Sequence, residues 1–354
     1  MSFLKNKVFF GIAFLVFLNI AFAFVQENQD GQRFGFNAIE SPIKGITVVA
    51  PPKPFTGKSL RRLTDIHAEW VAFVPYAFSR SGQPNVSFNN ERQWWGEKSD
   101  GIESSIIAAR EEGLKIMLKP QVYIGGGWVG DMDFDKESDW NAWEKNYEAY
   151  IMEFAQIAVK HNVEMFCIGT EYNIAVKKRP NFWKELIKDI KKTYKGQLIY
   201  SANWDNYQDV TFWDELDYIG ISSYFPLSEA QNPTINLLYK EWKPIKKALK
   251  SFAYKQQKKI IFTEYGYLSV DGCAGKTWEL EKNIQTLTVN NQAQCNAYDA
   301  LWSTFGDEDF WGGGFLWKWF PDNMGHEGYF EKDYTPQEKP AELILKKWFN
   351  SNKK

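Results

Sequence analysis

The stretch Met165-Phe166-Cys167-Ile168-Gly169-Thr170-Glu171 is an apolar run that ends in threonine and then glutamate. A second stretch, Ile260-Ile261-Phe262-Thr263-Glu264, follows the same pattern. Apolar runs of about four to eight residues predict buried strands. A carboxylate placed directly after a buried strand costs free energy unless it is paired or used in chemistry. The two stretches therefore predict two buried strands, each with an ionisable group at its carboxyl end.

Runs of this kind recur along the chain, and helical spacing of apolar residues separates them, most clearly in 101–112 and 140–161. Residues 335–348 indicate a closing helix. Strands that alternate with helices predict parallel βαβ units. Eight such units, with no second domain, predict a single (β/α)8 TIM barrel over residues 30–350; a doubly wound sheet is the alternative. The eight expected strands are Ile43–Ala50, Trp70–Tyr76, Lys115–Tyr123, Met165–Thr170, Gln197–Asn203, Tyr218–Tyr224, Lys259–Tyr265 and Gly313–Phe320.

Residues 1–23 have the pattern of a secretory signal peptide. Two lysines precede an almost continuous apolar run, Val8–Phe24, and Ala21-Phe22-Ala23 gives the small-x-small pattern of a cleavage site. We therefore expect a periplasmic or secreted protein with no membrane attachment after cleavage. An uncleaved anchor is the alternative, because about 17 apolar residues just reach spanning length.

The exported compartment permits disulfides. Cys273 and Cys295 lie in one loop-like region after the seventh expected strand, and we predict that they are bridged; two free thiols are the alternative. Cys167 lies inside an apolar run and is expected to be a buried free thiol.

Composition excludes several classes of function. Lys plus Arg is 42 against 44 for Asp plus Glu, and this balance argues against nucleic-acid binding. Aromatic residues make up 17% of the chain, with 16 tryptophans, and an exposed tryptophan is costly unless something stacks on it. We expect a soluble globular enzyme or binding domain, acting as a monomer.

No cofactor or metal is expected. Gly125–Gly130 matches G-x-G-x-x-G, but the aspartates that follow, Asp131, Asp133 and Asp135, would repel a phosphate. These aspartates begin like a calcium loop, yet Lys136 replaces its glycine, so that a solvated acidic loop is favoured over a weak calcium site. Three histidines leave little room for a histidine-based metal site.

The two strand-end glutamates, Glu171 and Glu264, are the expected catalytic residues. Chemistry in a TIM barrel takes place at the carboxyl ends of the strands. Two carboxyl groups without a metal set are what cleavage of a glycosidic bond requires, because one donates a proton and the other acts as nucleophile or base.

The chain resembles glycoside hydrolase family 113, a family of β-mannanases within clan A. The likeness runs over essentially the whole mature chain and includes residues 44–47, 59–63, 70–75 and 218–226, together with Leu118-Lys119-Pro120-Gln121-Val122, Gly169-Thr170-Glu171, Thr263-Glu264-Tyr265-Gly266-Tyr267 and Trp317-Lys318-Trp319. It implies a TIM barrel with Glu171 as acid/base and Glu264 as nucleophile. Thr170 stands where many clan A members have asparagine, as is expected for this family. Gln121 departs from the family pattern, because it replaces the histidine of the Lys-Pro-His stretch.

The same resemblance suggests the substrate-binding residues. Clan members place a tryptophan under the sugar, here Trp317, and a tyrosine that hydrogen-bonds the nucleophile, here Tyr224. Stacking aromatics and amide or charged groups at other strand ends complete a glycan cleft. The remaining candidates are Lys119, Gln121, Asn203, Trp204 and Trp95. Trp94 and Trp128 are further loop tryptophans.

The function expected from these residues and the resemblance is a secreted, retaining endo-β-1,4-mannanase that acts on mannan or glucomannan. Two alternatives use the same barrel: an exo-acting β-glycosidase or transglycosylase of another β-glycan, and a non-catalytic barrel that only binds glycan. The presence of both Glu171 and Glu264 argues against the binding-only alternative.

Overall fold

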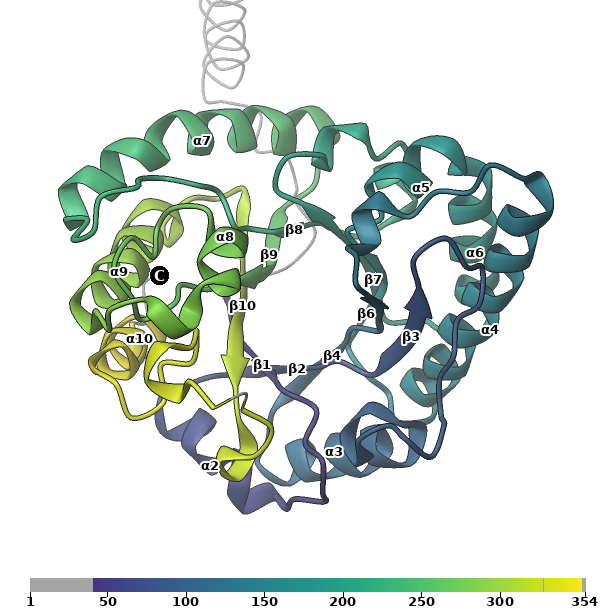
Figure 1. The fold of residues 1–354 in the computed structure, drawn as a ribbon, viewed down its shortest axis with the longest axis horizontal. Helices are drawn as coiled ribbons and strands as arrows, with labels where there is room; N and C mark the ends of the chain where they lie inside the picture. Colours follow the sequence, from purple (N-terminus) through teal and green to yellow (C-terminus); the bar gives the residue numbers. More distant parts are fainter. Residues whose placement is uncertain (1–40, 327, 352–354) are drawn as a thin grey trace, which may run out of the picture. The chain divides into compact units, whose positions relative to one another are not determined.

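Eight parallel strands close into a barrel in the computed structural model, which describes residues 41–326 and 328–351 (Figure 1). Around the barrel the order is β1-β10-β9-β8-β7-β6-β4-β2. This closed sheet confirms the TIM-barrel prediction. The predicted signal peptide, residues 1–23, lies outside the described residues. The barrel strands are β1 (Ile43–Val48), β2 (Trp70–Phe73), β4 (Lys115–Leu118), β6 (Met165–Thr170), β7 (Gln197–Asn203), β8 (Ile219–Ser222), β9 (Ile260–Tyr265) and β10 (Trp311–Trp319).

Most of the helices form a ring outside the strands, and the short α8 lies inside that ring in the view of Figure 1. They are α2 (Gly57–Asp65), α3 (Ser99–Glu111), α4 (Glu137–Lys160), α5 (Asn173–Lys178), α6 (Pro180–Thr193), α7 (Ile235–Gln256), α8 (Thr277–Lys282), α9 (Asn291–Phe305) and α10 (Pro340–Asn350). Short 3-10 helices are η1 (Trp95–Glu97), η2 (Val129–Asp131), η3 (Tyr207–Asp209), η4 (Trp213–Glu215), η5 (Ile284–Thr286), η6 (Pro321–Asn323) and η7 (Phe330–Lys332). Within the described residues, no helix is long and apolar enough to cross a membrane.

The closing helix begins at Pro340, five residues later than predicted. Gln337 is the reason, because its side-chain amide takes the place of a strand partner for Phe320. The backbone N–H of Phe320 donates to Gln337 Oε1 (2.6 Å), and Gln337 Nε2 donates to the Phe320 carbonyl oxygen (3.0 Å). The segment before Pro340 is thereby fastened to the end of β10 and does not join the helix.

The second and third predicted strands are each divided by a proline. β2 ends before Pro75 and β3 (Tyr76–Arg80) begins after it, while Pro120 separates β4 from β5 (Gln121–Gly125) in the same way. Proline has no N–H to donate to a strand ladder. β3 and β5 then pair with each other as a separate two-stranded parallel sheet. The chain therefore leaves the barrel twice and builds an extra wall beside it.

A packed apolar layer fills the barrel interior. Its residues come from seven of the strands and from Tyr218, which directly precedes β8. Gly45 shows how tightly they fit, because a Cβ there would lie 2.4 Å from the Phe315 ring. Such packing leaves no pore, as is usual in barrels of this size. The layer consists of Ile43, Trp70, Ala72, Met117, Met165, Cys167, Ile199, Tyr218, Ile261 and Phe315.

The predicted disulfide between Cys273 and Cys295 is wrong. Both residues are free thiols, as is Cys167. Cys273 lies in the turn after β9 and Cys295 on α9, and both are buried. Burial raises the pKa of the Cys273 thiol to about 12. These side chains therefore pack as small neutral groups, which need no bridge to be accommodated in the interior.

Lys339, which precedes α10, is a buried lysine with an unusual proton affinity. Its ammonium donates to Ser269 Oγ and to the Asp333 carbonyl oxygen, each at 2.8 Å. Burial lowers its pKa to about 8. An unfolded lysine titrates near 10.4, so that between about pH 8 and pH 10 the unfolded chain holds a proton that the folded chain has lost.

We expect this lysine to make the free energy of unfolding rise with pH across that window, by up to about 1.4 kcal/mol per pH unit. Lys339→Met should remove that contribution, so that the wild type gains stability relative to the variant from pH 8 to pH 10. Urea unfolding at several pH values measures the difference. Lys346→Met, at an exposed position of α10, is the control. Parallel pH dependences for wild type and Lys339→Met would contradict the expectation.

Candidate active site

Glu171 and Glu264 lie at the same end of the barrel, after β6 and near the end of β9. Two strands, β7 and β8, separate them in the barrel order. Glu171 has a φ of 59°, a left-handed conformation that is uncommon for residues other than glycine. Its backbone N–H is held by the carbonyl oxygen of Ser201 at 2.8 Å. A strained backbone that the surrounding structure holds in place is typical of functional positions.

An aromatic cluster anchors the chain next to Glu171. Tyr172 is buried, and its backbone N–H donates to the Tyr200 hydroxyl at 2.8 Å. Tyr147, on α4, donates to the Ile168 carbonyl oxygen at 2.9 Å, within β6. Trp183, on α6, packs against both Tyr172 and Tyr200. The buried face of two helices therefore fixes the backbone from which Glu171 projects.

Glu264 is almost fully buried, at 6% exposure, and each of its oxygens has a donor. Oε1 forms an ion pair with the ammonium of Lys119, which is wholly buried, and accepts a hydrogen bond from Gln121 Nε2 at 2.6 Å. Oε2 accepts a hydrogen bond from the Tyr224 hydroxyl at 2.9 Å. The structure thus brings together four residues that the sequence analysis selected, from the ends of β4, β8 and β9 and the start of β5.

The environment of Glu171 favours its protonated form. Burial raises the pKa of this carboxyl group, and the negative charge of Glu264 raises it further. Hydrogen bonds from Trp128 and Ser222 and the charge of Lys119 act in the opposite direction, and the net shift is upward. Burial, and after it the charge of Glu264, raises the pKa of Tyr224 well above its usual value, so that the phenol keeps its proton.

Two carboxyl groups with different environments can act as a proton donor and an anionic nucleophile. The carboxylate of Glu264 is paired with the Lys119 cation and accepts two further hydrogen bonds. The pKa of Glu171, in contrast, is raised. No group of three potential metal ligands occurs among residues 41–326 and 328–351. In the acidic loop, Asp133 is paired with Lys178 at 2.6 Å. The two glutamate side chains therefore offer acid–base and nucleophilic chemistry.

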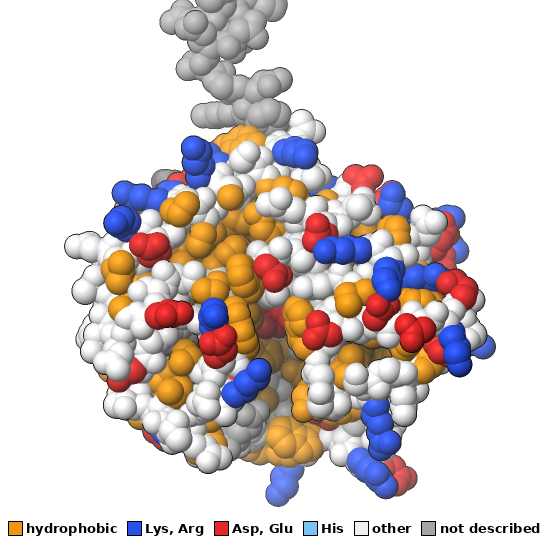
Figure 2. All heavy atoms as spheres, turned by 45° about the horizontal axis from the view of Figure 1, so that its top comes forward, with side chains coloured by type: hydrophobic (Ala, Val, Ile, Leu, Met, Phe, Trp, Pro, Cys, Tyr) orange, Lys and Arg blue, Asp and Glu red, His pale blue; other side chains and the backbone are white. Residues whose placement is uncertain are grey.

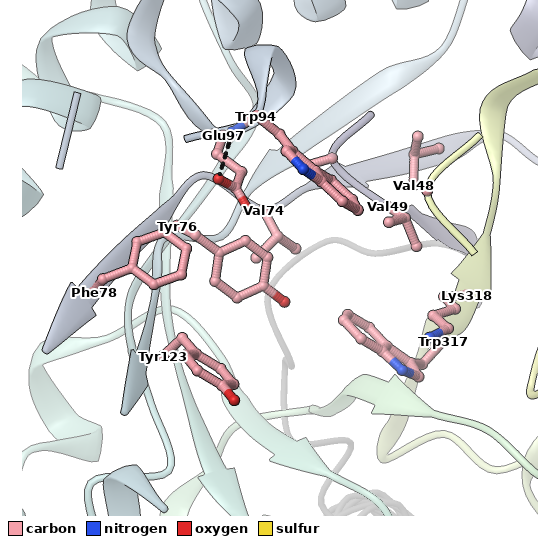
Figure 3. Close-up of a pocket in the computed structure, with 12 residues that line it drawn as sticks. Val48, Val49, Val74, Tyr76, Phe78, Trp94, Glu97, Tyr123, Trp317 and Lys318 are labelled. Carbon is pink, nitrogen blue, oxygen red and sulfur yellow. Dashed lines mark hydrogen bonds between the residues drawn. The ribbon is translucent and has the colours of Figure 1, made fainter. Parts of the chain in front are cut away.

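A cavity of about 290 Å³ opens on one side of the barrel mouth (Figure 3). Trp317, at the end of β10, faces aromatic rings that project from the β3/β5 wall, with Trp94 above them (Figure 3). The residues that line it are Val48, Val49, Ala50, Val74, Tyr76, Phe78, Trp94, Glu97, Tyr123, Trp317, Lys318 and Gly325.

Trp95, which the sequence analysis selected, does not line this cavity. Its ring packs edge-on against Phe55, with the centroids 6.0 Å apart, while its neighbour Trp94 is exposed and reaches the cavity. Adjacent residues point in different directions, and the sequence carries no local signal for which of the two would face the cavity. Tyr76 and Tyr123 were missed because the proline breaks that create the extra wall were not anticipated.

A second aromatic surface lies after β7 and β9. Trp204 stacks on Trp278 of α8, with ring centroids 6.0 Å apart, and contacts Phe225. Trp278 is 37% exposed and had no sequence signal, because it sits in a long connection. Asn203 donates to Asp205 at 2.9 Å and contacts neither glutamate in the hydrogen bonds of the described residues. The face seen in Figure 2 is hollowed near its centre, with hydrophobic side chains along the hollow.

We expect Glu264→Gln to lower the pKa of Glu171. The substitution removes the negative charge that raises this pKa and leaves the Lys119 cation uncompensated, and both changes favour the ionised form of Glu171. Carboxyl ¹³C NMR titration, with Glu171 assigned by its loss in Glu171→Gln, measures the shift. The surface substitution Glu103→Gln should leave it unchanged. A pKa of Glu171 that stays the same or rises in Glu264→Gln would contradict the electrostatic coupling.

Comparison with known proteins identifies the family of the chain. The family model for Glycoside Hydrolase Family 113 matches residues 52–339. The structure is similar to the family 113 β-mannanase AaManA from Alicyclobacillus acidocaldarius in complex with ManMIm (26% identity, TM-score 0.76, covering 89% of this chain and 98% of that one). It is also similar to a complex of a family 113 β-1,4-mannanase (28% identity, TM-score 0.73, covering 88% and 99%).

A β-glucuronidase from Ruminococcus gnavus shares the fold at 13% identity, with a TM-score of 0.59 over 87% of this chain and 50% of that one. A search of curated proteins finds no match. The family model covers most of the barrel, including both glutamates and the residues that contact Glu264. The chain therefore belongs to glycoside hydrolase family 113 and is a glycoside hydrolase.

Proposed function

We propose that the protein is a retaining endo-β-1,4-mannanase, with Glu264 as nucleophile and Glu171 as acid/base. The unequal environments of the two glutamates carry this assignment. A nucleophile must be ionised, and Glu264 has a buried ammonium and two further donors on its oxygens. A general acid must hold a proton, and burial together with the charge of Glu264 raises the pKa of Glu171.

The proposed reaction has two displacements. In the first, Glu171 gives its proton to the glycosidic oxygen while a Glu264 oxygen attacks the anomeric carbon, so that the carbon–oxygen bond breaks and the leaving sugar departs as an alcohol. In the second, Glu171 takes a proton from water, the water oxygen attacks the same carbon, and the bond to Glu264 breaks. Glu264 leaves as a carboxylate and Glu171 is protonated again.

Formation of the ester prepares Glu171 for its second role. Esterification removes the negative charge of Glu264, which is the second cause of the raised pKa of Glu171. The Lys119 cation, which lowers that pKa, remains in place. The pKa of Glu171 therefore falls in the intermediate, and the carboxylate becomes available as a base when water arrives.

Two separate aromatic surfaces at the barrel mouth support endo action. The cavity is lined from the ends of β1, β2 and β10, whereas Trp204 and Trp278 follow β7 and β9. β1 and β7 are four strands apart in the barrel of eight. The C–H faces of sugar rings stack on aromatic side chains, so that a glycan chain could be bound on both sides of the cleaved bond.

The mannan assignment is supported by the two family 113 mannanase structures to which the chain is similar. Gln121 differs from the histidine that the family resemblance implies, and it supplies a neutral donor to Glu264. We also propose that the enzyme is exported, on the basis of the signal-like pattern of residues 1–23.

Incubation of the purified protein with β-mannan, glucomannan, β-glucan and xylan, followed by product sizing, tests the substrate. We expect a mixture of oligosaccharides from mannan and glucomannan, with Glu264→Gln inactive. Cleavage of another β-glycan alone would overturn the mannan assignment. Release of a single small product from the chain ends would overturn the endo assignment, because a chain bound across the site is cut internally.

Azide rescue tests the roles of the two glutamates. Glu264→Ala should be inactive on an activated aryl β-glycoside and should regain part of its activity with azide, forming the α-glycosyl azide. Glu171→Ala should still form the glycosyl-enzyme from such a substrate, and azide should then give the β-product. The wild type should first release the β-anomer, as measured by ¹H NMR. Inverted product from the wild type, or exchange of the two azide products, would show that the assignment is wrong.

A further inference from the structure

Trp128 contacts the carboxyl group of Glu171 from the loop that joins β5 to η2. Its indole Nε1 donates to Glu171 Oε2 at 2.9 Å. Trp128 follows the glycines that end β5 and precedes η2, and its side chain remains 38% exposed. An exposed indole in a glycine-rich loop is free to adopt many positions, so that its placement on one carboxyl oxygen needs a cause.

Gly130 supplies that cause. A Cβ built on Gly130 would lie 2.4 Å from the Cη2 and Cζ3 atoms of Trp128, which is closer than two non-bonded carbon atoms can approach. The six-membered ring of the indole therefore rests directly on the α-carbon of Gly130. This contact supports the ring from one side while its N–H points to Glu171. Any side chain at residue 130 would have to displace the ring.

We propose that Trp128 is a positioning residue for the acid/base: its indole N–H holds Oε2 of Glu171, so that Oε1 carries the proton exchanged with substrate and water. The inference rests on the proposed function, because it takes Glu171 as the acid/base. Indole nitrogen is a donor only and cannot receive a proton from Oε2. The bond therefore distinguishes two oxygens that would otherwise be equivalent, and it fixes the rotation of the carboxyl group relative to the glycosidic oxygen.

The contact also affects when Glu171 is protonated. A hydrogen bond donated to a carboxylate favours the ionised form, and the Trp128 bond lowers the pKa of Glu171. Loss of the indole N–H should raise this pKa and extend activity to higher pH, because the general acid stays protonated there. The ionisable groups that face Glu171 from the other elements are Glu264, Lys119, Tyr200 and Tyr224.

Two substitutions remove the contact in different ways. Trp128→Phe keeps an aromatic ring but has no N–H, and Gly130→Ala keeps the indole but displaces it. The matched control is Trp348→Phe, which removes a hydrogen bond (2.6 Å) from the indole of Trp348 on α10 to Asp299 on α9, in the outer layer of helices. The measurement is kcat and kcat/KM against pH on whichever β-glycan the wild type cleaves, and in parallel on an activated aryl glycoside. Thermal unfolding establishes that each variant is folded.

We expect both variants to lose kcat by roughly tenfold or more on the natural glycan, because a misoriented general acid protonates the leaving group less effectively. The basic limb of their pH profiles should move to higher pH. The glycosylation step with the activated substrate, which needs no acid, should be nearly unaffected. The Trp348→Phe profile should match the wild type. If Trp128 only stacks on sugar, Trp128→Phe will raise KM and leave the basic limb in place, and this result would overturn the inference. If substitution of Glu171 leaves the activity of the enzyme unchanged, the proposed function itself would be overturned.

Discussion

The ion pair between Lys119 and Glu264 is the interaction on which the site depends. Both charges are buried, and removal of one partner from such a pair leaves an uncompensated charge at a cost of about 3–5 kcal/mol. The pair is tolerable because further donors from Gln121 and Tyr224 satisfy the carboxylate. Pro120 ends β4 directly after Lys119, so that the backbone leaves the barrel just where the lysine side chain must enter it.

The rest of the mouth is arranged around that fixed charge. Lys119 limits how far the charge of Glu264 can raise the pKa of Glu171, and burial is the larger cause of the shift. The two glutamates also differ mechanically. Glu264 belongs to a strand with neighbours on both sides, whereas Glu171 follows its strand in a left-handed conformation and is held by Ser201 and the aromatic cluster. One carboxyl group is fixed by charge and the other by backbone geometry.

The barrel and the positions of the two glutamates could be predicted from sequence, because each depends on local order. The Tyr224 contact with Glu264 came from the family resemblance, and Lys119 and Gln121 were expected to bind substrate, although they bind Glu264 in the structure. Apolar runs mark strands, a residue directly after a run lies at the mouth, and Lys119 and Gln121, two residues apart, reach the same side. The extra β3/β5 wall depended on Pro75 and Pro120 acting together across about 45 residues of chain. Such pairing has no local signature.

Loop residues were the hardest to place, since the backbone of a long connection decides which of two neighbours faces inward. Trp94 reaches the cavity and Trp95 does not, although their sequence context is shared. Trp128 was named only as a further loop tryptophan, yet its indole packs over Gly130 and donates to Glu171. The disulfide prediction failed for a related reason: compartment and spacing permit a bridge, but packing of two buried thiols decides whether it forms.

The small β3/β5 sheet has a consequence for how the enzyme could diversify. Tyr76, Phe78 and Tyr123 stand on paired strands, so that the conformational entropy of this wall is lost when the protein folds and not when a ligand arrives. The chain enters this wall through Pro75 and Pro120, which follow β2 and β4 and place its strands outside the barrel ladder. Changes in the length of the loops that follow β3 and β5 can therefore reshape one side of the cleft without disturbing the register of the barrel strands. Substrate specificity can then evolve separately from the catalytic charges.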